Sequence, residues 1–438
     1  MWRIAIAIVA AAVLGLMGFF FLAWRPAIAP IEPPTAASFP VDSIAKGEIL
    51  AAAGHCVSCH TRPGGQPFAG GYGVNTPFGI IYGTNITPDP ETGIGRWSLE
   101  AFDRAMREGV SRDGSHLFPA FPYNAYTELL DDDVKALYAY LMTQPPAAAT
   151  VPPNTVPFPL SIRAFQEGWK ILFFRSGRNR PDSSKSAEWN RGAYLAGALS
   201  DCGGCHTPRN LLGAEKTNEA YAGAVIDEWI APALTEANPS PVPWNQTELK
   251  SYLRTGLGPL HGAATAATMT PVVREGLGVT VVPESDVRAL AIYFADIDHA
   301  SAHESAAEPA VKNALATSYL GSDQEYDPDA RLYASACISC HYNSGSAPLP
   351  ARPELALNSA LTLSEPTNFI QTVLKGINNA EGAPGLVMPP FASSLTDAQV
   401  AALAAYLRRT RTRLPPWTDL EKKVAAIRQQ PTPSTDTR

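Results

Sequence analysis

The longest hydrophobic stretch of the chain lies at its N-terminus, where residues 4–23 run without a charge. Twenty apolar residues are enough for a helix that crosses a membrane. A cleaved export signal is the alternative, but its apolar core is usually only about 7 to 15 residues long. We therefore predict that residues 1–29 form a retained N-terminal anchor. In either case the body of the chain is expected to be exported.

Beyond this segment, apolar residues at helical spacing recur in three similar groups. Each group contains an amphipathic stretch that ends at a glycine, then a loop, then an apolar helix whose first turn an aspartate or threonine can cap. The amphipathic stretches are residues 97–109, 244–256 and 366–376, and the closing helices are residues 132–140, 286–293 and 396–406. Forty prolines and 33 glycines suggest short helices joined by long loops. The expected fold class is all-α.

The three groups predict three tandem domains of one plan, with loop-rich connections between them. The first linker contains the apolar run 169–174, so we expect it to pack across domains and to fix them relative to one another. The C-terminal stretch 417–428 is predicted to form an amphipathic helix. This helix either contacts a membrane or partner or packs on domain 3. The predicted boundaries are 42–145 for domain 1, 146–188 for the first linker, 189–296 for domain 2, 297–325 for the second linker, 326–412 for domain 3 and 413–438 for the C-terminal helix and tail.

The six cysteines occur only as three Cys-x-x-Cys pairs, and a histidine follows each pair at once. This is the attachment motif of c-type haem, in which both thiols bond to the porphyrin and the adjacent imidazole binds the iron. A thioredoxin-like pair would need a βαβ setting, and a zinc site would need two pairs in one short stretch. We therefore predict three covalently bound haem c groups, at Cys56, Cys59 and His60, at Cys202, Cys205 and His206, and at Cys337, Cys340 and His341.

The composition excludes one class of partner and indicates the cellular compartment. The chain is 45% hydrophobic and 17% charged, and its net charge of -7 offers no basic surface for nucleic acid. All six cysteines belong to the three motifs, so no spare thiol is present, as suits an oxidising compartment. Covalent haem attachment in bacteria requires export. We therefore expect the chain on the periplasmic side of the bacterial inner membrane.

A low-spin electron-transfer haem has a second axial ligand, for which methionine is a common choice. Met388 and Met269 lie 12 and 13 residues after the glycine that ends the preceding amphipathic stretch, in the loop before the closing helix. A side chain in this loop can reach over the haem. We predict Met388 as the second ligand of haem 3 and Met269 as that of haem 2. Met106 and Met142 fall within helices, where packing is their expected role.

Domain 1 breaks this pattern, because Phe121 stands 12 residues after Gly109 and cannot bind iron. His116 lies in the same loop, and a neutral imidazole is a good iron ligand. We predict His60/His116 coordination for haem 1. The competing interpretations are a five-coordinate haem and a surface histidine with Met106 moved in. The remaining histidines are interpreted as solvated at His55, His299 and His303, and as a weak alternative ligand of haem 2 at His261.

Several segments resemble one family over nearly the whole chain after the anchor. They are the run TPFGIIYGTNITPDPETGIGRWS at 76–98, the Phe-Pro-Tyr loop ending at Tyr123, the Cys-His-Thr-Pro-Arg run at 205–209 and the Met388 loop. The chain resembles the tri-haem cytochrome c subunits of membrane-bound bacterial dehydrogenases, of the quinoprotein alcohol and the flavin-dependent gluconate types. The resemblance implies electron transfer from a catalytic dehydrogenase subunit to ubiquinone or the respiratory chain.

Phe121 departs from the alcohol dehydrogenase subunits, which carry methionine at that place in the loop. The combination of histidine and phenylalanine resembles the cytochrome subunits that accompany molybdenum hydroxylases, which act on aldehydes or N-heterocycles such as nicotinate. The expected function is therefore that of an electron-transfer subunit without a catalytic site of its own. The alternative is a self-sufficient, peroxidase-like haem enzyme, which requires that haem 1 be open and that His116 not bind iron.

Overall fold

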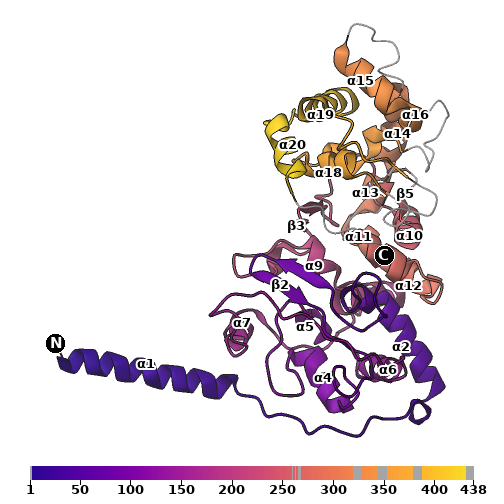
Figure 1. Cartoon of the computed structure of the whole chain (residues 1–438). Coiled ribbons are helices and arrows are strands. Elements are labelled where there is room, and N and C mark those ends of the chain that lie inside the picture. Colours follow the sequence, from indigo (N-terminus) through magenta and orange to yellow (C-terminus); the bar gives the residue numbers. More distant parts are fainter. Residues whose placement is uncertain are drawn as a thin grey trace. The chain divides into compact units, whose positions relative to one another are not determined.

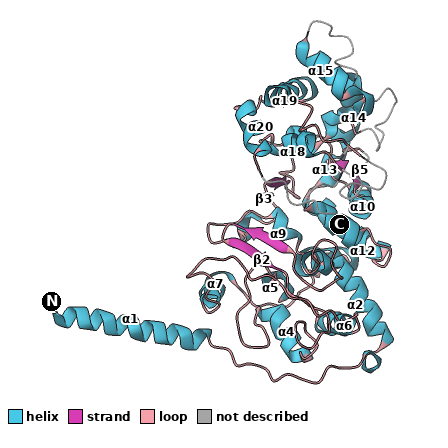
Figure 2. Ribbon diagram, viewed as in Figure 1, coloured by secondary structure: helices cyan, strands magenta, loops and turns pink. Residues whose placement is uncertain are grey.

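The structure is a computed structural model that describes residues 2–258, 260–261, 263–264, 268–318, 327–342, 353–377 and 387–430. The chain divides into two compact units, Met1–Pro181 and Asp182–Arg438, and the division falls inside the predicted first linker. Both units are mostly helical, as predicted (Figure 2). The described residues also form three antiparallel hairpins, which were not expected from the sequence. They pair β1 Gly73–Thr76 with β2 Gly79–Tyr82, β3 Ala224–Ile226 with β4 Trp229–Ala231, and β5 Leu257–Gly258 with β6 Ala263–Ala264.

The N-terminal segment forms one long apolar helix, α1 Trp2–Ala23, which projects from unit 1 (Figure 1). Its length and composition are sufficient to cross a membrane. The chain that follows α1 is hydrogen bonded to the body of unit 1. Ile28 N donates to Arg112 O at 2.8 Å, and Ile31 N donates to Arg96 O at 3.0 Å. The end of α1 is therefore fixed to domain 1.

In domain 1 the main packing contact is between the first and last helices, α2 Val41–Ala53 and α6 Asp131–Met142. The two backbones approach closely at Gly47, where an added Cβ would lie 2.0 Å from Ala136 O. Leu50 and Val134 are almost fully buried near this crossing. The other elements of unit 1 are η1 Ala36–Ser38, α3 Cys56–Cys59, α4 Leu99–Glu108, α5 Tyr123–Tyr126 and α7 Phe165–Phe173.

Two further pairs of helices pack against each other in the described part of unit 2, within the predicted domains 2 and 3. In domain 2, α8 Ala187–Tyr194 packs on α12 Glu284–Ile297, and an added Cβ at Gly192 would lie 2.0 Å from Ala289 O. In domain 3, α15 Pro328–Ala336 packs on α19 Asp397–Arg411, with the buried small residue Ala330. The other elements of domains 2 and 3 are η2 Leu195–Leu199, α9 Cys202–His206, η3 Thr217–Glu219, α10 Gln246–Thr255, α11 Met269–Pro271, η4 Val272–Leu277, α16 Ile338–His341, η6 Leu355–Leu357, α17 Ser359–Thr362 and α18 Thr367–Lys375.

Within unit 2, polar contacts to β4 and the turn before it join the predicted domains 2 and 3. Asn368 of α18 accepts from Ile230 N and donates to Ile230 O, both at 2.8 Å. Gln371 Nε2, one turn further along α18, donates to Glu228 O at 3.0 Å. The Asn368 side-chain amide thus bonds the backbone of β4 as a residue of a neighbouring strand would.

The described part of the predicted second linker, residues 297–318, is largely helical, with α13 Ala300–His303, η5 Glu304–Ala306 and α14 Ala307–Ser318. Alanine is the strongest helix former, and Ala314 is buried in a small cluster with Val242 and Leu357. The C-terminal helix α20 Leu420–Arg428 packs on domain 3, where Val424 is fully buried. Of the two possibilities open for this segment, the structure shows packing on domain 3.

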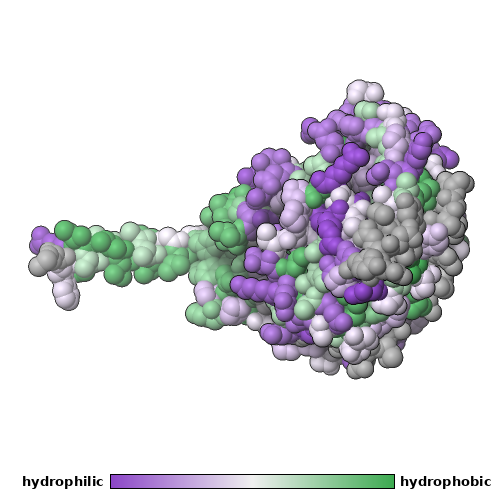
Figure 3. Space-filling view, turned by 90° about the horizontal axis from the view of Figure 1, so that it is seen from above, coloured by the Kyte–Doolittle hydropathy of each residue, from purple (hydrophilic) through white to green (hydrophobic). Residues whose placement is uncertain are grey.

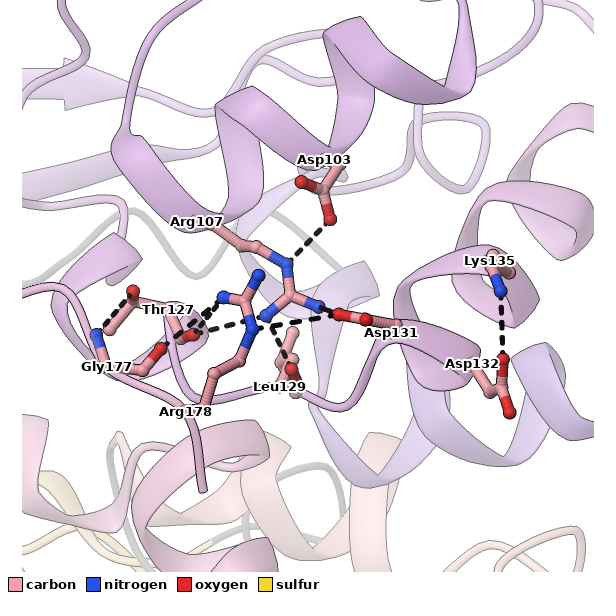
Figure 4. Close-up of polar contacts among 9 residues, drawn as sticks. All are labelled: Asp103, Arg107, Thr127, Leu129, Asp131, Asp132, Lys135, Gly177 and Arg178. Atoms are coloured by element: carbon pink, nitrogen blue, oxygen red, sulfur yellow. Dashed lines mark hydrogen bonds and ion pairs between the residues drawn. The ribbon is translucent and has the colours of Figure 1, made fainter. Parts of the chain in front are cut away.

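The arginine in the last turn of each of the first two amphipathic helices anchors the loop that follows. Arg107, at the end of α4, is buried and donates to Thr127 O at 3.1 Å and to Leu129 O at 2.5 Å (Figure 4). It also pairs with Asp103 at 2.6 Å and with Asp131, at the start of α6, at 2.7 Å. The same arrangement recurs in domain 2, where Arg254 donates to Leu277 O, Val279 O and Val282 O and pairs with Glu284.

Replacing Arg107 by methionine should lower the free energy of unfolding of unit 1 by about 3 kcal/mol, because buried carbonyls that lose a donor cost roughly 1–3 kcal/mol each. Urea unfolding followed by circular dichroism measures this change. Lys135→Met is the matched control, because Lys135 and its partner Asp132 are both exposed and an exposed pair contributes little. Equal effects of the two substitutions would show that the Arg107 contacts do not stabilise the domain.

Candidate haem-attachment sites

Each Cys-x-x-Cys pair lies on a short helical turn directly after the first helix of its domain. In domains 1 and 2 the turn is preceded by a residue in the left-handed region, His55 with φ 40° and Asp201 with φ 45°. In domain 3, Cys337 follows α15 without such a residue. The six cysteines, all of them among the described residues, form no disulfide.

The three motif histidines share one arrangement. Nδ1 of His60 lies 2.6 Å from Thr84 O, Nδ1 of His206 lies 2.7 Å from Pro232 O, and Nδ1 of His341 lies 3.1 Å from Pro353 O. A carbonyl oxygen can only accept, so each Nδ1 carries the proton and donates it. Each Nε2 therefore keeps the lone pair that binds a metal.

Burial holds the pKa of His60, His206 and His341 below the usual value, which keeps the rings neutral. The neutral imidazole is the form that ligates iron. Two thiols at the required spacing and one oriented imidazole stand at each of the three motifs. The residues present therefore fit a c-type haem at each site.

Two of the three accepting carbonyls come from loops that follow hairpins, a feature that residue types do not reveal. The hairpin of β1 and β2 leads into Gly83 and Thr84, and the hairpin of β3 and β4 leads into Pro232. Gly83 passes so close to the motif helix that an added Cβ would lie 1.9 Å from Cys59 O. Glycine is therefore required there for the Thr84 carbonyl to reach His60.

The thiols do not have the properties of a reactive redox pair. Burial raises the pKa of Cys56 and of Cys202 to about 12, and the pKa of Cys337 to about 11. Thioredoxin-like pairs work through a thiol whose pKa is lowered. These three thiols therefore lack the lowered pKa that thiol exchange uses.

Of the two predicted methionine ligands, Met388 lies in the loop before α19, whereas Met269 begins a short helix before α12. Met388 forms an antiparallel bridge with Ile377, the residue after the glycine that ends α18, with N–O distances of 2.8 and 2.9 Å. Met269 is the first residue of α11, and both methionine side chains are half-buried. Met106 and Met142 are buried in the core, which confirms the packing role predicted for them.

His116 has the backbone position of a distal ligand but a different side-chain environment. It bridges Val110, the residue after the glycine that ends α4, as Met388 bridges Ile377. Its Nε2, however, lies 2.7 Å from Ala23 O at the end of α1, and its Nδ1 lies 3.0 Å from Lys170 Nζ on α7.

Polypeptide groups thus occupy both ring nitrogens of His116, which is buried. The Ala23 carbonyl can only accept, so Nε2 carries the proton and Nδ1 accepts from the Lys170 ammonium. Burial holds the pKa of His116 below its usual value, in agreement with a neutral ring. Coordination of iron by His116 stays a prediction, and it requires that one of these two contacts be broken.

Other residues that the sequence singled out have packing or surface roles here. Phe121 lies in edge contact with Tyr126, with ring centroids 5.4 Å apart. His261 is buried against Trp244, and its Nδ1 and Nε2 contact Glu248 at 2.9 Å and Val242 O at 3.1 Å. His299 and His303 are exposed, as predicted.

Comparison with known families gives two matches. The family described as cytochrome c matches residues 44–145, and the family described as cytochrome c oxidase, cbb3-type, subunit III matches residues 324–407. The first includes the Cys56 motif and the second includes the Cys337 motif and Met388. These matches support c-type haem in the two matched segments.

The chain is also similar to individual proteins over most of its length. The chain is 37% identical to the fructose dehydrogenase cytochrome subunit of Gluconobacter japonicus, over 86% of this chain and 81% of that protein. It is 35% identical to the gluconate 2-dehydrogenase cytochrome c subunit of Pantoea cypripedii, over 89% of this chain and 90% of that protein. It is 44% identical to a nicotinate dehydrogenase subunit of Pseudomonas putida over 98% of this chain, which spans only 35% of that longer protein.

Proposed function

The chain belongs to the cytochrome c subunits of membrane-bound dehydrogenases, and we propose that it carries three covalent haems that pass electrons from a catalytic dehydrogenase subunit to ubiquinone or the respiratory chain. The observation that carries this proposal is the threefold recurrence of one site. Two thiols, one neutral imidazole and one accepting carbonyl stand together at His60, His206 and His341.

A bound haem would supply one-electron chemistry at its iron, and the polypeptide determines how the iron is held. The carbonyl partner fixes the plane of each imidazole and keeps Nε2 available. Met269 and Met388 are the proposed second ligands of haems 2 and 3. Thioether ligation opposite histidine raises the potential of a haem, so these two haems would be better electron acceptors than a bis-histidine haem.

For haem 1, His116 is the proposed second ligand on the strength of its backbone position. A bis-histidine haem 1 would be low-spin and of lower potential than haems 2 and 3. If His116 keeps its contacts with Ala23 and Lys170, it would not be available to the iron, and haem 1 would be five-coordinate. Magnetic circular dichroism of the oxidised protein separates these two states, since a five-coordinate haem is high-spin.

The proposed location is the periplasmic side of the bacterial inner membrane, with α1 as a retained anchor. The hydrogen bonds of Ile28 and Ile31 to domain 1 support retention, because they join the residues after α1 to the folded body. The proposed catalytic partner is a molybdenum hydroxylase, a quinoprotein or a flavoprotein. The 44% identity to the nicotinate dehydrogenase subunit favours the first, with an N-heterocycle or an aldehyde as the substrate of the complex.

The test is to solubilise membranes that contain the tagged full chain and to identify the subunits that purify with it. We expect a dehydrogenase subunit whose substrate reduces the haems of the purified complex within the dead time of manual mixing. A chain that purifies alone from its native membrane, and whose haems no substrate of the membrane fraction reduces, would contradict the proposal.

A further inference from the structure

In the helix α7, polar residues face the interior of the protein and apolar residues face outward. This is the reverse of a helix on the surface of a water-soluble domain. Gln166 and Lys170 are buried, whereas Ile171 and Leu172 are 55% and 59% exposed. An amphipathic helix on a water-soluble domain turns its apolar face inward. The outward face of α7 is therefore suited to an apolar environment.

The contacts of the inward face explain why α7 cannot turn over. Lys170 Nζ donates to Glu108 O at 2.5 Å and to Gly109 O at 2.8 Å, two carbonyls at the end of α4. Glu167, on the same face, pairs with Arg25 at 2.9 Å. Rotation of α7 would remove the Lys170 ammonium from both carbonyls, so that Gly109 O would keep only Leu117 N as a donor, and it would bury Ile171 in place of the ammonium. The polar contacts thus hold the apolar face outward and tie α7 rigidly to domain 1.

The exposed face of α7 is continuous with α1. The ring of Phe165 lies 5.9 Å from that of Phe19 and 6.3 Å from that of Phe20. Gly168 also faces Phe19, since an added Cβ would lie 3.7 Å from that ring. Hydrophobic surface covers α1 and continues where α1 meets the body (Figure 3).

The contact with α1 sets the depth of α7. The 22 residues of α1 span about 33 Å at 1.5 Å per residue, and the hydrocarbon core of a bilayer is about 30 Å thick. Phe19 and Phe20 lie in the last turns of α1, so they reach the edge of that core. A helix packed against these two rings lies at the level of the lipid headgroups.

The residues on both sides of α7 have the composition of an interfacial segment. Before the helix, Phe158 is 80% exposed and Leu160 is 42% exposed. After it come two exposed arginines: Arg175 donates to Phe174 O at 2.8 Å, and Arg178, whose side chain stays 58% exposed, contacts Thr127 O and Asp131. Apolar side chains that enter the acyl boundary beside arginines that reach phosphates are typical of interfacial helices.

We propose that residues 158–178, with α7 at their centre, bind the lipid–water interface beside α1 and hold domain 1 against the membrane surface. This inference rests on the proposal that α1 is a membrane anchor. The occupant of the apolar face is the bilayer itself, because α7 adjoins the helix that would cross it. Domain 1 is then the membrane-proximal haem domain.

The test uses the full, haem-loaded chain in vesicles of phosphatidylcholine and phosphatidylglycerol. A nitroxide is attached at Leu172→Cys, and the collision rates of the label with oxygen and with a water-soluble nickel chelate are measured by electron paramagnetic resonance. Phe158→Cys is a second site on the same surface. Leu211→Cys is the matched control, an exposed leucine at 97% on a loop of unit 2.

We expect oxygen to relax the labels at positions 172 and 158 several-fold more, relative to nickel, than the label at position 211. Equal oxygen-to-nickel ratios at all three positions would overturn the proposal. Alkaline carbonate extraction of the same vesicles tests the anchor separately. A chain that resists carbonate extraction but carries a water-exposed label at position 172 would support the anchor and contradict the interfacial helix. A chain released by carbonate would contradict both.

Discussion

Replacing Cys202 and Cys205 together by serine is expected to reduce the covalent haem content from three groups per chain to two. Serine fits the space of cysteine, but its oxygen does not form the thioether bonds that retain the porphyrin after denaturation. The measurement is the haem-to-protein ratio of the denatured chain, from its pyridine haemochrome spectrum and its intact mass. Loss of one whole haem group is the largest change in haem content that we expect from altering a single motif.

Gly203→Ala, between the same two cysteines, is the matched control. An added Cβ there meets Glu215 and Thr207 side-chain oxygens at 3.4 Å and the Tyr221 ring at 3.8 Å, which are ordinary contacts, so the variant should keep all three haems. If the double serine variant kept the haem content of the unmodified chain, the assignment of this motif to haem would be wrong.

Replacing Met388 by leucine is expected to lower the potential of haem 3 and to abolish the methionine–iron charge-transfer band of that haem. Leucine has nearly the volume of methionine, so folding should change by less than about 1.5 kcal/mol. Loss of the thioether removes the ligand that favours the reduced haem, and axial ligands tune haem potentials over roughly 0.8 V. We expect a fall of at least about a tenth of that range in a spectroelectrochemical titration.

Met106→Leu is the control for this substitution, because Met106 is a buried core residue of α4. Its charge-transfer bands and potentials should match those of the unmodified chain. Indistinguishable titrations of the Met388 and Met106 variants would remove Met388 from the ligand set.

The helices could be predicted from the sequence because each carries a periodic apolar face and its own start and stop signals. Thr396 shows this, since its side chain accepts from Gln399 N and forms a capping box with the Gln399 side chain at the start of α19. Gly109, with φ 61°, ends α4 in the left-handed region that glycine adopts readily. Local chemistry of this kind needs no tertiary information.

The supporting contacts of the sites could not be predicted, because backbone carbonyls carry no mark in the sequence. Thr84, Pro232 and Pro353 accept from the motif histidines through main-chain oxygen, so their residue types are irrelevant to the contact. The hairpins that present two of these carbonyls are only three or four residues per strand. Such short strands are below what alternation of apolar residues reveals.

His116 shows a different limit of sequence reasoning. Its ring contacts Ala23 and Lys170, which are 93 and 54 residues away along the chain. The loop position of His116 predicted a ligand, and the bridge to Val110 agrees with that position. The polar contacts of the ring depend on how α1 and α7 pack on domain 1, which no local pattern records.

The central claim is that three haems are covalently bound at the three Cys-x-x-Cys-His motifs. The most direct measurement is the intact mass of the full chain, purified from a host that loads haem, denatured and extracted with acid acetone. We predict a mass increased by three haem groups and no titratable thiol among the six cysteines. A colourless chain of unmodified mass with six titratable thiols would contradict this claim.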